Sequence, residues 1–189
     1  MYHTIVFLLG FQSMGIFVLC VKCELEGIAR VQFAEGARWC LDLENQGESK
    51  TGVYICPDEE YEVPGGRGMA NFVMKWSESK RDCNISIIEL KDFTRNQYTA
   101  GDVGEFVPVV AFECRGCDVV GFKLHDPFEI ESTGGYVWKD AELDDAEWCE
   151  YDEENDLSVM LTEFESKIEA HSGKAAGGKK GKKGKKKKG

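Results

Sequence analysis

The sequence is poor in histidine, the residue on which most hydrolases and many metal centres depend. It contains three histidines among 189 residues, and only His125 lies away from both ends of the chain. Because a serine or cysteine nucleophile needs a histidine base within reach, a hydrolytic enzyme is not expected. A phosphate-binding glycine loop, a dinucleotide fingerprint, a metalloprotease helix and an EF-hand loop are also missing from the sequence. The sequence therefore predicts a protein that is not an enzyme.

Proline is scarce as well, and each of two segments contains charged residues of only one sign. With four prolines, 42% hydrophobic and 11% aromatic residues, the chain is not a disordered polymer, and its length suits one domain with a core. The formal net charge of −11 is unevenly distributed: residues 173–189 carry nine lysines and no acid, whereas residues 140–156 carry ten acids and no base. A cationic tail thus follows a strongly acidic body.

An apolar segment near the start, Thr4–Val21, predicts a secretory signal peptide. Cleavage after Cys23 places Val21 and Cys23 at the two small-residue positions and leaves six cysteines, an even number. Residues 1–23 are therefore assigned to the signal peptide, which implies a secreted, extracellular protein with no membrane span after cleavage. The alternative is an uncleaved membrane anchor, because no Lys or Arg precedes the apolar run and about 18 apolar residues is the lower limit of a span.

Short apolar runs separated by turn residues fill residues 24–171. Runs such as Ile85–Leu90 and Val119–Leu124 have the length of strands, and glycine-rich segments such as Thr133-Gly134-Gly135 suit the reversals between them. This pattern predicts a mainly β fold: a disulfide-stabilised single β-rich domain, sandwich-like, with its topology left open. Residues 172–189, composed of Ser, Gly, Ala and Lys, are expected to form a disordered polybasic tail.

One segment departs from the β pattern. Leu157, Leu161, Phe164 and Ile168 recur at helical spacing and predict a C-terminal amphipathic helix over about 157–170. The helix either docks on the sheet or keeps its apolar face for a partner.

The expected use of cysteine follows from the predicted secretion. In an oxidising compartment the six remaining cysteines are expected to form three disulfides, and 15 pairings are open. They are Cys40, Cys56, Cys83, Cys114, Cys117 and Cys149. The one distinctive spacing, Cys114-Arg115-Gly116-Cys117, has two interpretations, a redox pair or a structural bridge. Its strand-like flanks favour the structural bridge, and the scattered positions of the other cysteines argue against a zinc site.

The acidic segment 140–156 supplies the oxygen ligands that Ca²⁺ prefers, although it lacks the spacing of a calcium loop. We therefore expect no cofactor beyond weak Ca²⁺ binding, the alternative being a solvated acidic loop. The expected metal ligands are Asp144, Asp145, Asp152, Glu153 and Glu154. Tyr151 in this segment is a candidate for tyrosine sulfation, and Asn84 in Asn84-Ile85-Ser86 is an acceptor for N-glycosylation.

The lysine tail lacks aromatic residues and arginine forks, so it is expected to bind polyanions without reading a specific nucleic acid. The expected partners are sulfated glycans, acidic matrix proteins, and anionic surfaces or mineral. The alternative is that the tail is neutralised by the acidic body of its own chain. The polyanion-binding residues are Lys179, Lys180, Lys182, Lys183, Lys185, Lys186, Lys187 and Lys188.

Together these features predict a secreted, non-catalytic protein of the extracellular matrix or of a biomineral. It is expected to bind charged polymers or mineral through the polylysine tail and the acidic segment. The alternative is a secreted host-defence or venom-type protein whose acidic domain restrains a basic segment. A third class, a secreted enzyme, requires a cleft near His125 or a close pair of carboxylates in a pocket.

Overall fold

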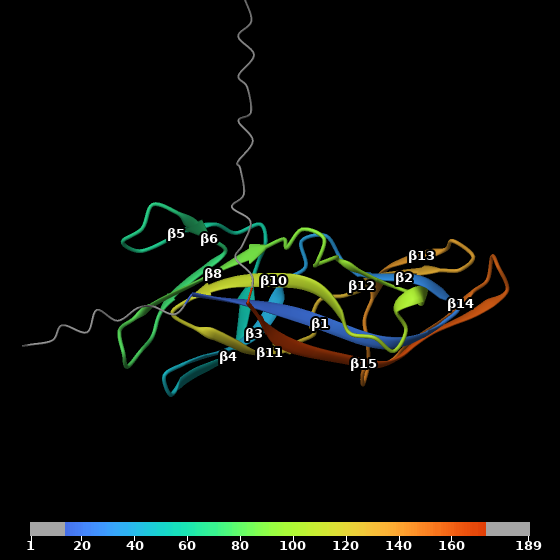
Figure 1. The fold of residues 1–189 in the computed structure, drawn as a ribbon. Helices are drawn as coiled ribbons and strands as arrows, with labels where there is room; N and C mark the ends of the chain where they lie inside the picture. Colours follow the sequence, from blue (N-terminus) through green and yellow to red (C-terminus); the bar gives the residue numbers. More distant parts are fainter. Residues whose placement is uncertain (1–13, 173–189) are drawn as a thin grey trace, which may run out of the picture.

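Three long antiparallel strands run along the molecule in the computed structural model, which describes residues 14–172 (Figure 1). They are β1 (Met14–Glu26), β10 (Val107–Arg115) and β15 (Leu157–His171). Strand β1 lies between the other two and pairs with β10 on one side and with β15 on the other. Three further strands extend this sheet, β7 (Phe72–Lys75), β8 (Asp82–Ile88) and β14 (Trp148–Asp152). The resulting order is β14-β15-β1-β10-β8-β7.

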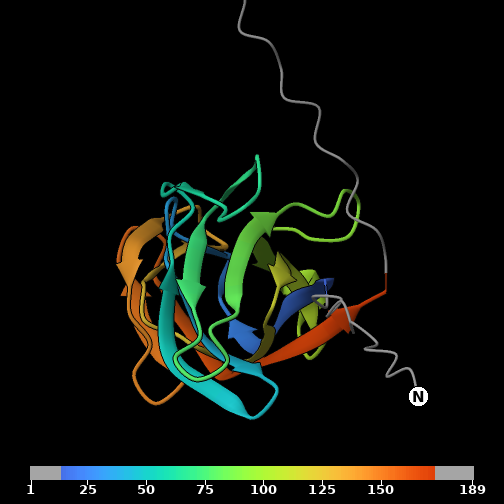
Figure 2. The ribbon, with the colours of Figure 1, turned by 90° about the vertical axis from the view of Figure 1, so that its left-hand side faces the viewer.

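Two smaller antiparallel sheets complete most of the fold. The three-stranded sheet has the order β11-β3-β4, and its strands are β3 (Trp39–Asn45), β4 (Glu48–Ile55) and β11 (Asp118–Lys123). The four-stranded sheet has the order β13-β12-β2-β9, and its strands are β2 (Ile28–Phe33), β9 (Gln97–Thr99), β12 (Phe128–Ser132) and β13 (Val137–Ala141). Viewed from the end in Figure 2, the strands curl around a shared interior.

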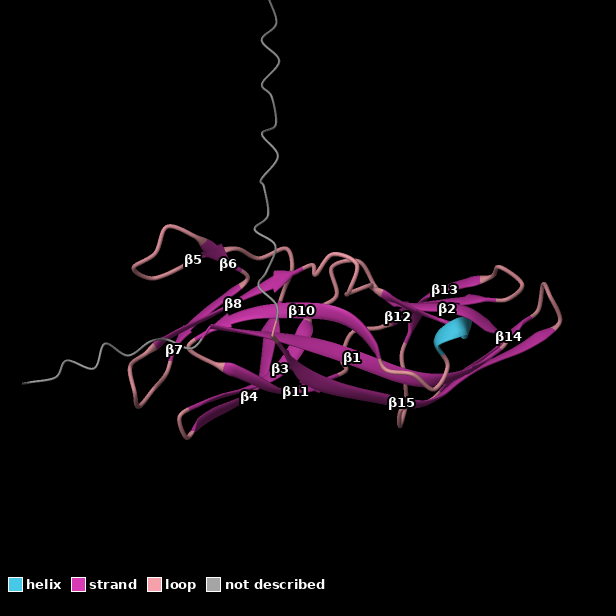
Figure 3. Ribbon diagram, in the orientation of Figure 1, coloured by secondary structure: helices cyan, strands magenta, loops and turns pink. Residues whose placement is uncertain are grey.

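Helix is confined to one short 3-10 turn among the described residues, η1 (Ala100–Asp102), drawn in cyan in Figure 3. A two-stranded hairpin, β5 (Tyr61–Glu62) with β6 (Met69–Ala70), lies outside the larger sheets. None of residues 14–172 belongs to a helix of the length and apolarity needed to cross a membrane. The prediction of a mainly β fold is confirmed.

Strand β1 is buried on both faces. Leu19 and Val21 point into the main hydrophobic core, whereas Val18 and Cys20 point into a second, smaller cluster that includes Ala111. A fully buried aliphatic side chain contributes about 1.5–3 kcal/mol to folding. Because successive side chains of β1 are buried on opposite faces, the strand reads as a continuous apolar run rather than as an alternating one.

This burial conflicts with the predicted cleavage after Cys23. Cleavage after Cys23 would remove Met14–Cys23, which is most of the strand between β10 and β15. The apolar run that suggested a leader is, from Met14 onward, a core strand of the sheet, so the predicted cleavage site conflicts with the fold. Residues 1–13 of the predicted leader lie outside the described residues.

The predicted C-terminal helix is wrong, because residues 157–171 form β15, the longest strand. Leu157 and Leu161 face the core with the parity expected of a strand. At Glu163 the backbone has a φ of 53°, and the register with β1 shifts between Lys22 and Glu24. After this β-bulge, the positions whose side chains face the core are shifted by one residue along the strand. The two halves of the strand then reproduce the alternating spacings of three and four residues that are typical of a helix.

We expect that a chain beginning at Glu24 does not fold, because it lacks the strand that pairs with both β10 and β15. A chain beginning at Met14, which keeps all of β1, is the matched control and is expected to fold. Far-ultraviolet circular dichroism and thermal unfolding of both chains test this. A cooperative transition of equal midpoint in the shorter chain would show that β1 is dispensable.

The substitution Glu163→Val is expected to lower the free energy of unfolding by about 1–3 kcal/mol, because a β-branched residue is strained at positive φ. Ser158→Val, at an exposed position of the same strand, is the control and should cost less. Urea denaturation of both variants measures the difference. Equal effects of the two substitutions would contradict the bulge as the source of the cost.

Candidate functional site

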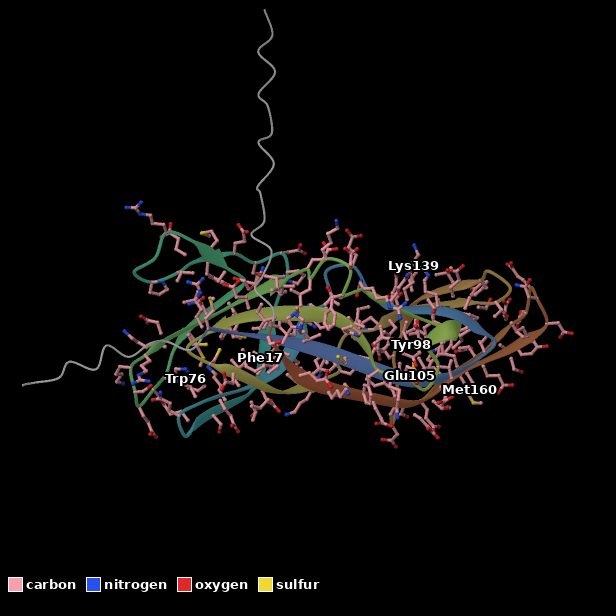
Figure 4. The ribbon with its side chains drawn as sticks, viewed as in Figure 1. Phe17, Trp76, Tyr98, Glu105, Lys139 and Met160 are labelled. Carbon is pink, nitrogen blue, oxygen red and sulfur yellow. The ribbon has the colours of Figure 1, made fainter. Side chains whose placement is uncertain are left out.

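Three turns meet at one end of the molecule. The turn between β3 and β4 (residues 45–48) contacts the turn between β7 and β8 (residues 76–81), because the Glu48 carboxylate accepts hydrogen bonds from the second turn. Trp76 donates its indole N–H to the carbonyl oxygen of Gly116, at 2.8 Å, in the turn between β10 and β11. Figure 4 labels Trp76 at this end of the molecule. We call this region the three-turn junction.

Three buried thiols lie at the junction. Cys83 follows the β7–β8 turn, Cys114 lies near the end of β10, and Cys117 lies in the β10–β11 turn. The Cys117 thiol interacts with both other thiols, and the Cys114 thiol donates to the carbonyl oxygen of Phe112 at 3.8 Å. The side chains of Cys83 and Cys114 are fully buried, and Cys117 is 3% exposed. We call these three residues the thiol cluster.

The environment of Cys83 and Cys117 favours the protonated, neutral form of both thiols. The hydrogen bond with Cys117, together with burial, raises the pKa of the Cys83 thiol far above its ordinary value. The hydrogen bond with Cys114 and burial likewise raise the pKa of Cys117. Because the thiolate is the nucleophile and the metal ligand, the neutral thiols of Cys83 and Cys117 are unreactive at neutral pH.

Backbone geometry at Gly116 brings the β10–β11 turn against the start of β8. Gly116 has a φ of +74°, and a Cβ atom there would lie 2.3 Å from the carbonyl oxygen of Asp82. Only glycine permits so close an approach in this conformation. The register Cys114↔Ile85 between β10 and β8 completes the arrangement. Gly116, one of the two residues between the CxxC cysteines, thus lets the turn approach the strand that carries Cys83.

The predicted disulfides are not present among the described residues, where all eight cysteines are free. The exposed Cys149 lies on β14, at the edge of the six-stranded sheet, apart from the thiol cluster. The disulfide prediction depended on the predicted secretion, since the parity of the cysteine count was taken from the proposed cleavage site.

The fold buries Asn84, the predicted acceptor for N-glycosylation. Asn84 is 8% exposed and lies inside the six-stranded sheet, where it pairs with Val73 on β7 and with Arg115 on β10. A glycan needs an exposed acceptor side chain, which this position does not provide.

The acidic segment does not form the predicted calcium site. The Asp152 side chain is 1% exposed, and one of its oxygens accepts hydrogen bonds from the Ser132 hydroxyl at 2.6 Å and the Asn155 amide at 2.8 Å. Although burial opposes ionisation, these hydrogen bonds lower the pKa of Asp152. Asp152 is therefore a structural carboxylate that joins β14 to the end of β12. The other four expected ligands, Asp144, Asp145, Glu153 and Glu154, are exposed.

Two predictions remain untested: the modification of Tyr151 and the binding of polyanions by the lysine tail. Tyr151 is 49% exposed and donates its hydroxyl to the Asp156 carboxylate, so sulfation at Tyr151 stays a prediction. The polyanion-binding lysines of the tail lie outside the described residues, and their role stays a prediction.

His125 lies away from the thiols. It lines a cavity of about 370 Å³ with Asp126 and Glu142, and its ring lies 5.5 Å from the ring of Tyr54. A salt bridge of 2.8 Å to Arg38 holds Asp126 and lowers the pKa of its carboxyl. Strand β11 separates the thiol cluster from His125, and its six residues span roughly 20 Å. The structure therefore does not bring a cysteine nucleophile and this histidine together.

The fold and the junction define a class, a β protein with a buried thiol cluster that includes a Cys-x-x-Cys turn. The model of the family "CXXC motif containing zinc binding protein, eukaryotic" matches residues 18–169, and this chain belongs to that family. The CXXC motif containing zinc binding protein of Rattus norvegicus is 34% identical over 155 residues, which cover 79% of this chain and 95% of the rat protein.

Two solved structures share the fold. A hypothetical protein from Plasmodium falciparum has a TM-score of 0.75 and 26% identity, and the match covers 82% of this chain and all of that one. The crystal structure of C1orf123 has a TM-score of 0.73 and 31% identity over 82% of this chain and 98% of the other.

The family assignment corrects three predictions. The prediction of a secreted matrix, biomineral or host-defence protein that binds charged polymers is wrong, because the relatives are named for a CXXC motif and zinc. The expected roles in the extracellular matrix and in biomineralisation are wrong for the same reason. The prediction of no cofactor beyond weak Ca²⁺ is wrong as well, since the family is named for zinc. Extracellular localisation is tested by none of these comparisons and stays a prediction.

The thiol cluster does not form a zinc site as it lies. A closed structural zinc site has four Cys or His ligands, whereas the thiol cluster holds three, the Cys114–Cys117 pair and Cys83. Across residues 14–172 no group of three or more His, Cys, Asp or Glu side chains is placed to hold a metal ion. The donor atoms have the chemistry that zinc requires, but their number and arrangement do not fit a closed structural site.

Substitution of Trp76 by Phe is expected to cost about 1–3 kcal/mol, because the buried carbonyl of Gly116 loses its hydrogen-bond donor. Trp148→Phe, which removes the same atoms from a half-buried indole, is the control and should cost less. Thermal and urea unfolding of the two variants provide the comparison. Equal costs would show that the Trp76–Gly116 hydrogen bond does not stabilise the junction.

Proposed function

We propose that this chain is a non-catalytic member of its family that binds zinc weakly and exchangeably at the thiol cluster. The observation that carries the proposal is the contact of Cys117 with both Cys83 and Cys114, which gathers three sulfur atoms at one CxxC turn. Zinc binding is the property for which the relatives are named. The described residues supply no complete ligand set, which argues for weak rather than permanent binding.

Protonation of the thiols limits the affinity. Zinc binds thiolates, so binding must release the protons that the cluster holds through raised pKa values. The apparent affinity should therefore rise with pH over the range below those pKa values. A site with this behaviour exchanges its metal readily and depends on pH more strongly than a closed site.

The absence of catalysis is proposed from the placement of the reactive groups. The thiols are buried and neutral, and His125 lies beyond the other end of β11. The carboxylates of Asp126 and Glu142 line the cavity beside His125. The Asp126 carboxylate forms a salt bridge with Arg38. Neither place pairs a nucleophile with a free base, which is the arrangement that covalent or hydrolytic catalysis needs.

Competition with a chromophoric zinc chelator tests the proposal, using reduced full-length protein at pH 7 and pH 8.5. The wild-type chain is expected to compete weakly at pH 7 and at least about tenfold better at pH 8.5, because each proton released adds a tenfold dependence per pH unit. Cys117→Ser is expected to abolish competition, whereas Cys149→Ser, at an exposed cysteine on β14, should leave it unchanged.

Two results would overturn this function. One zinc ion per chain that survives purification and resists the chelator at pH 7 would show a closed site instead of a weak one. Identical competition by wild type and by Cys117→Ser would show that the thiol cluster is not where zinc binds.

A further inference from the structure

Glu48 makes the contacts that join two of the three turns. One carboxylate oxygen accepts the backbone N–H of Glu78 at 2.8 Å, and the other accepts the backbone N–H of Ser79 at 3.1 Å. Each oxygen therefore has its own donor, and both donors belong to the turn between β7 and β8. A carboxylate held by two backbone N–H groups makes charge-assisted hydrogen bonds, which are stronger than neutral ones.

A second contact joins the same two turns. The Arg81 guanidinium donates to the Gln46 side-chain oxygen at 2.6 Å, so the middle of the β7–β8 turn and its C-terminal end are both joined to the β3–β4 turn. Within the β7–β8 turn, the backbone N–H of Trp76 donates to the carbonyl oxygen of Arg81 at 2.9 Å. The turn is thus closed on itself and fastened to its neighbour through side chains that are not metal ligands.

The local electrostatics keep Glu48 ionised. Hydrogen bonds from the Ser79 side chain and from the backbone of Glu78 lower the pKa of the Glu48 carboxyl. At neutral pH the carboxylate is charged and accepts both N–H groups. The contact is therefore present at the pH values at which proteins ordinarily function.

The residue content of the two turns contrasts with the name of the family. A closed zinc site joins separate loops through four Cys or His ligands. Residues 45–48 read Asn-Gln-Gly-Glu and residues 76–81 read Trp-Ser-Glu-Ser-Lys-Arg, with no cysteine or histidine in either turn. Hydrogen bonds to the Glu48 carboxylate, together with the one from Arg81 to Gln46, make the connection between these two turns.

We infer that Glu48 is the cross-link of the three-turn junction, and that it fixes the β7–β8 turn in the way that a metal ion fixes loops in a closed zinc site. Glu48 is a positioning residue: through the β7–β8 turn it also sets Trp76, whose indole binds the CxxC turn. The inference does not rest on the proposed zinc binding, which concerns the thiols and not this carboxylate.

Amide hydrogen exchange in the full-length chain, followed residue by residue by NMR, tests the inference. In Glu48→Ala the amides of Glu78 and Ser79 are expected to exchange at least about tenfold faster than in wild type, because both lose a charged acceptor. In Glu48→Gln, which keeps the shape of the side chain, at least one of the two should exchange severalfold faster. Glu62→Ala, at an exposed carboxylate on β5, is the control and should leave both unchanged.

Two outcomes overturn the inference. Unchanged exchange at Glu78 and Ser79 in a folded Glu48→Ala chain would show that the carboxylate does not hold the turn, and Glu48→Gln decides the same question if the alanine variant does not fold. Faster exchange of these amides when the wild-type chain is treated with a metal chelator would show that a metal ion, and not Glu48, joins the turns. Neither outcome depends on Cys117, so failure here is distinguishable from failure of the zinc proposal.

Discussion

Burial of β1 on both faces is the constraint on which the rest of the structure depends. It pairs with β10 along one edge and with β15 along the other, and so holds these two long strands on either side of it. The register Gly15↔Cys114 aligns the start of β1 with the end of β10, where the CxxC turn begins. The position of the thiol cluster is thus a consequence of how β1 is packed, and the three-turn junction lies at the end of the sheet that β1 organises.

Part of this fold was predictable from the sequence, because apolar runs of strand length and glycine-rich reversals indicate β structure locally. The failures occurred where local pattern and tertiary structure disagree. Strand β1 was interpreted as a leader because a strand buried on both faces has the composition of a signal peptide. Strand β15 was interpreted as a helix because the bulge at Glu163 converts a period of two into spacings of three and four. Both errors follow from burial and register, which the sequence does not display.

The site was less accessible to prediction than the fold. The spacing of Cys114 and Cys117 marked the turn correctly, but the even cysteine count favoured disulfides once secretion was assumed. The proximity of Cys83 depends on the pairing of β8 with β10, and the role of Trp76 depends on a carbonyl 40 residues away in the sequence. Glu48 is one of 34 acidic residues, and nothing in its sequence neighbourhood distinguishes it. Contacts of this kind appear only after the chain has folded.

The pairing of β1 with β15 also determines the order in which the chain can reach its native state. Leu19 pairs with Ile168, about 150 residues further along, so the longest ladder in the molecule closes a loop that contains almost every other element. Contacts of such sequence separation slow folding, because the entropy of loop closure is lost before the contacts are gained. During synthesis β1 is among the first strands made, and it must wait with apolar residues and an unpaired edge until β15 emerges. The two-sided burial that stabilises the finished protein thus exposes apolar surface that favours aggregation while the chain is incomplete.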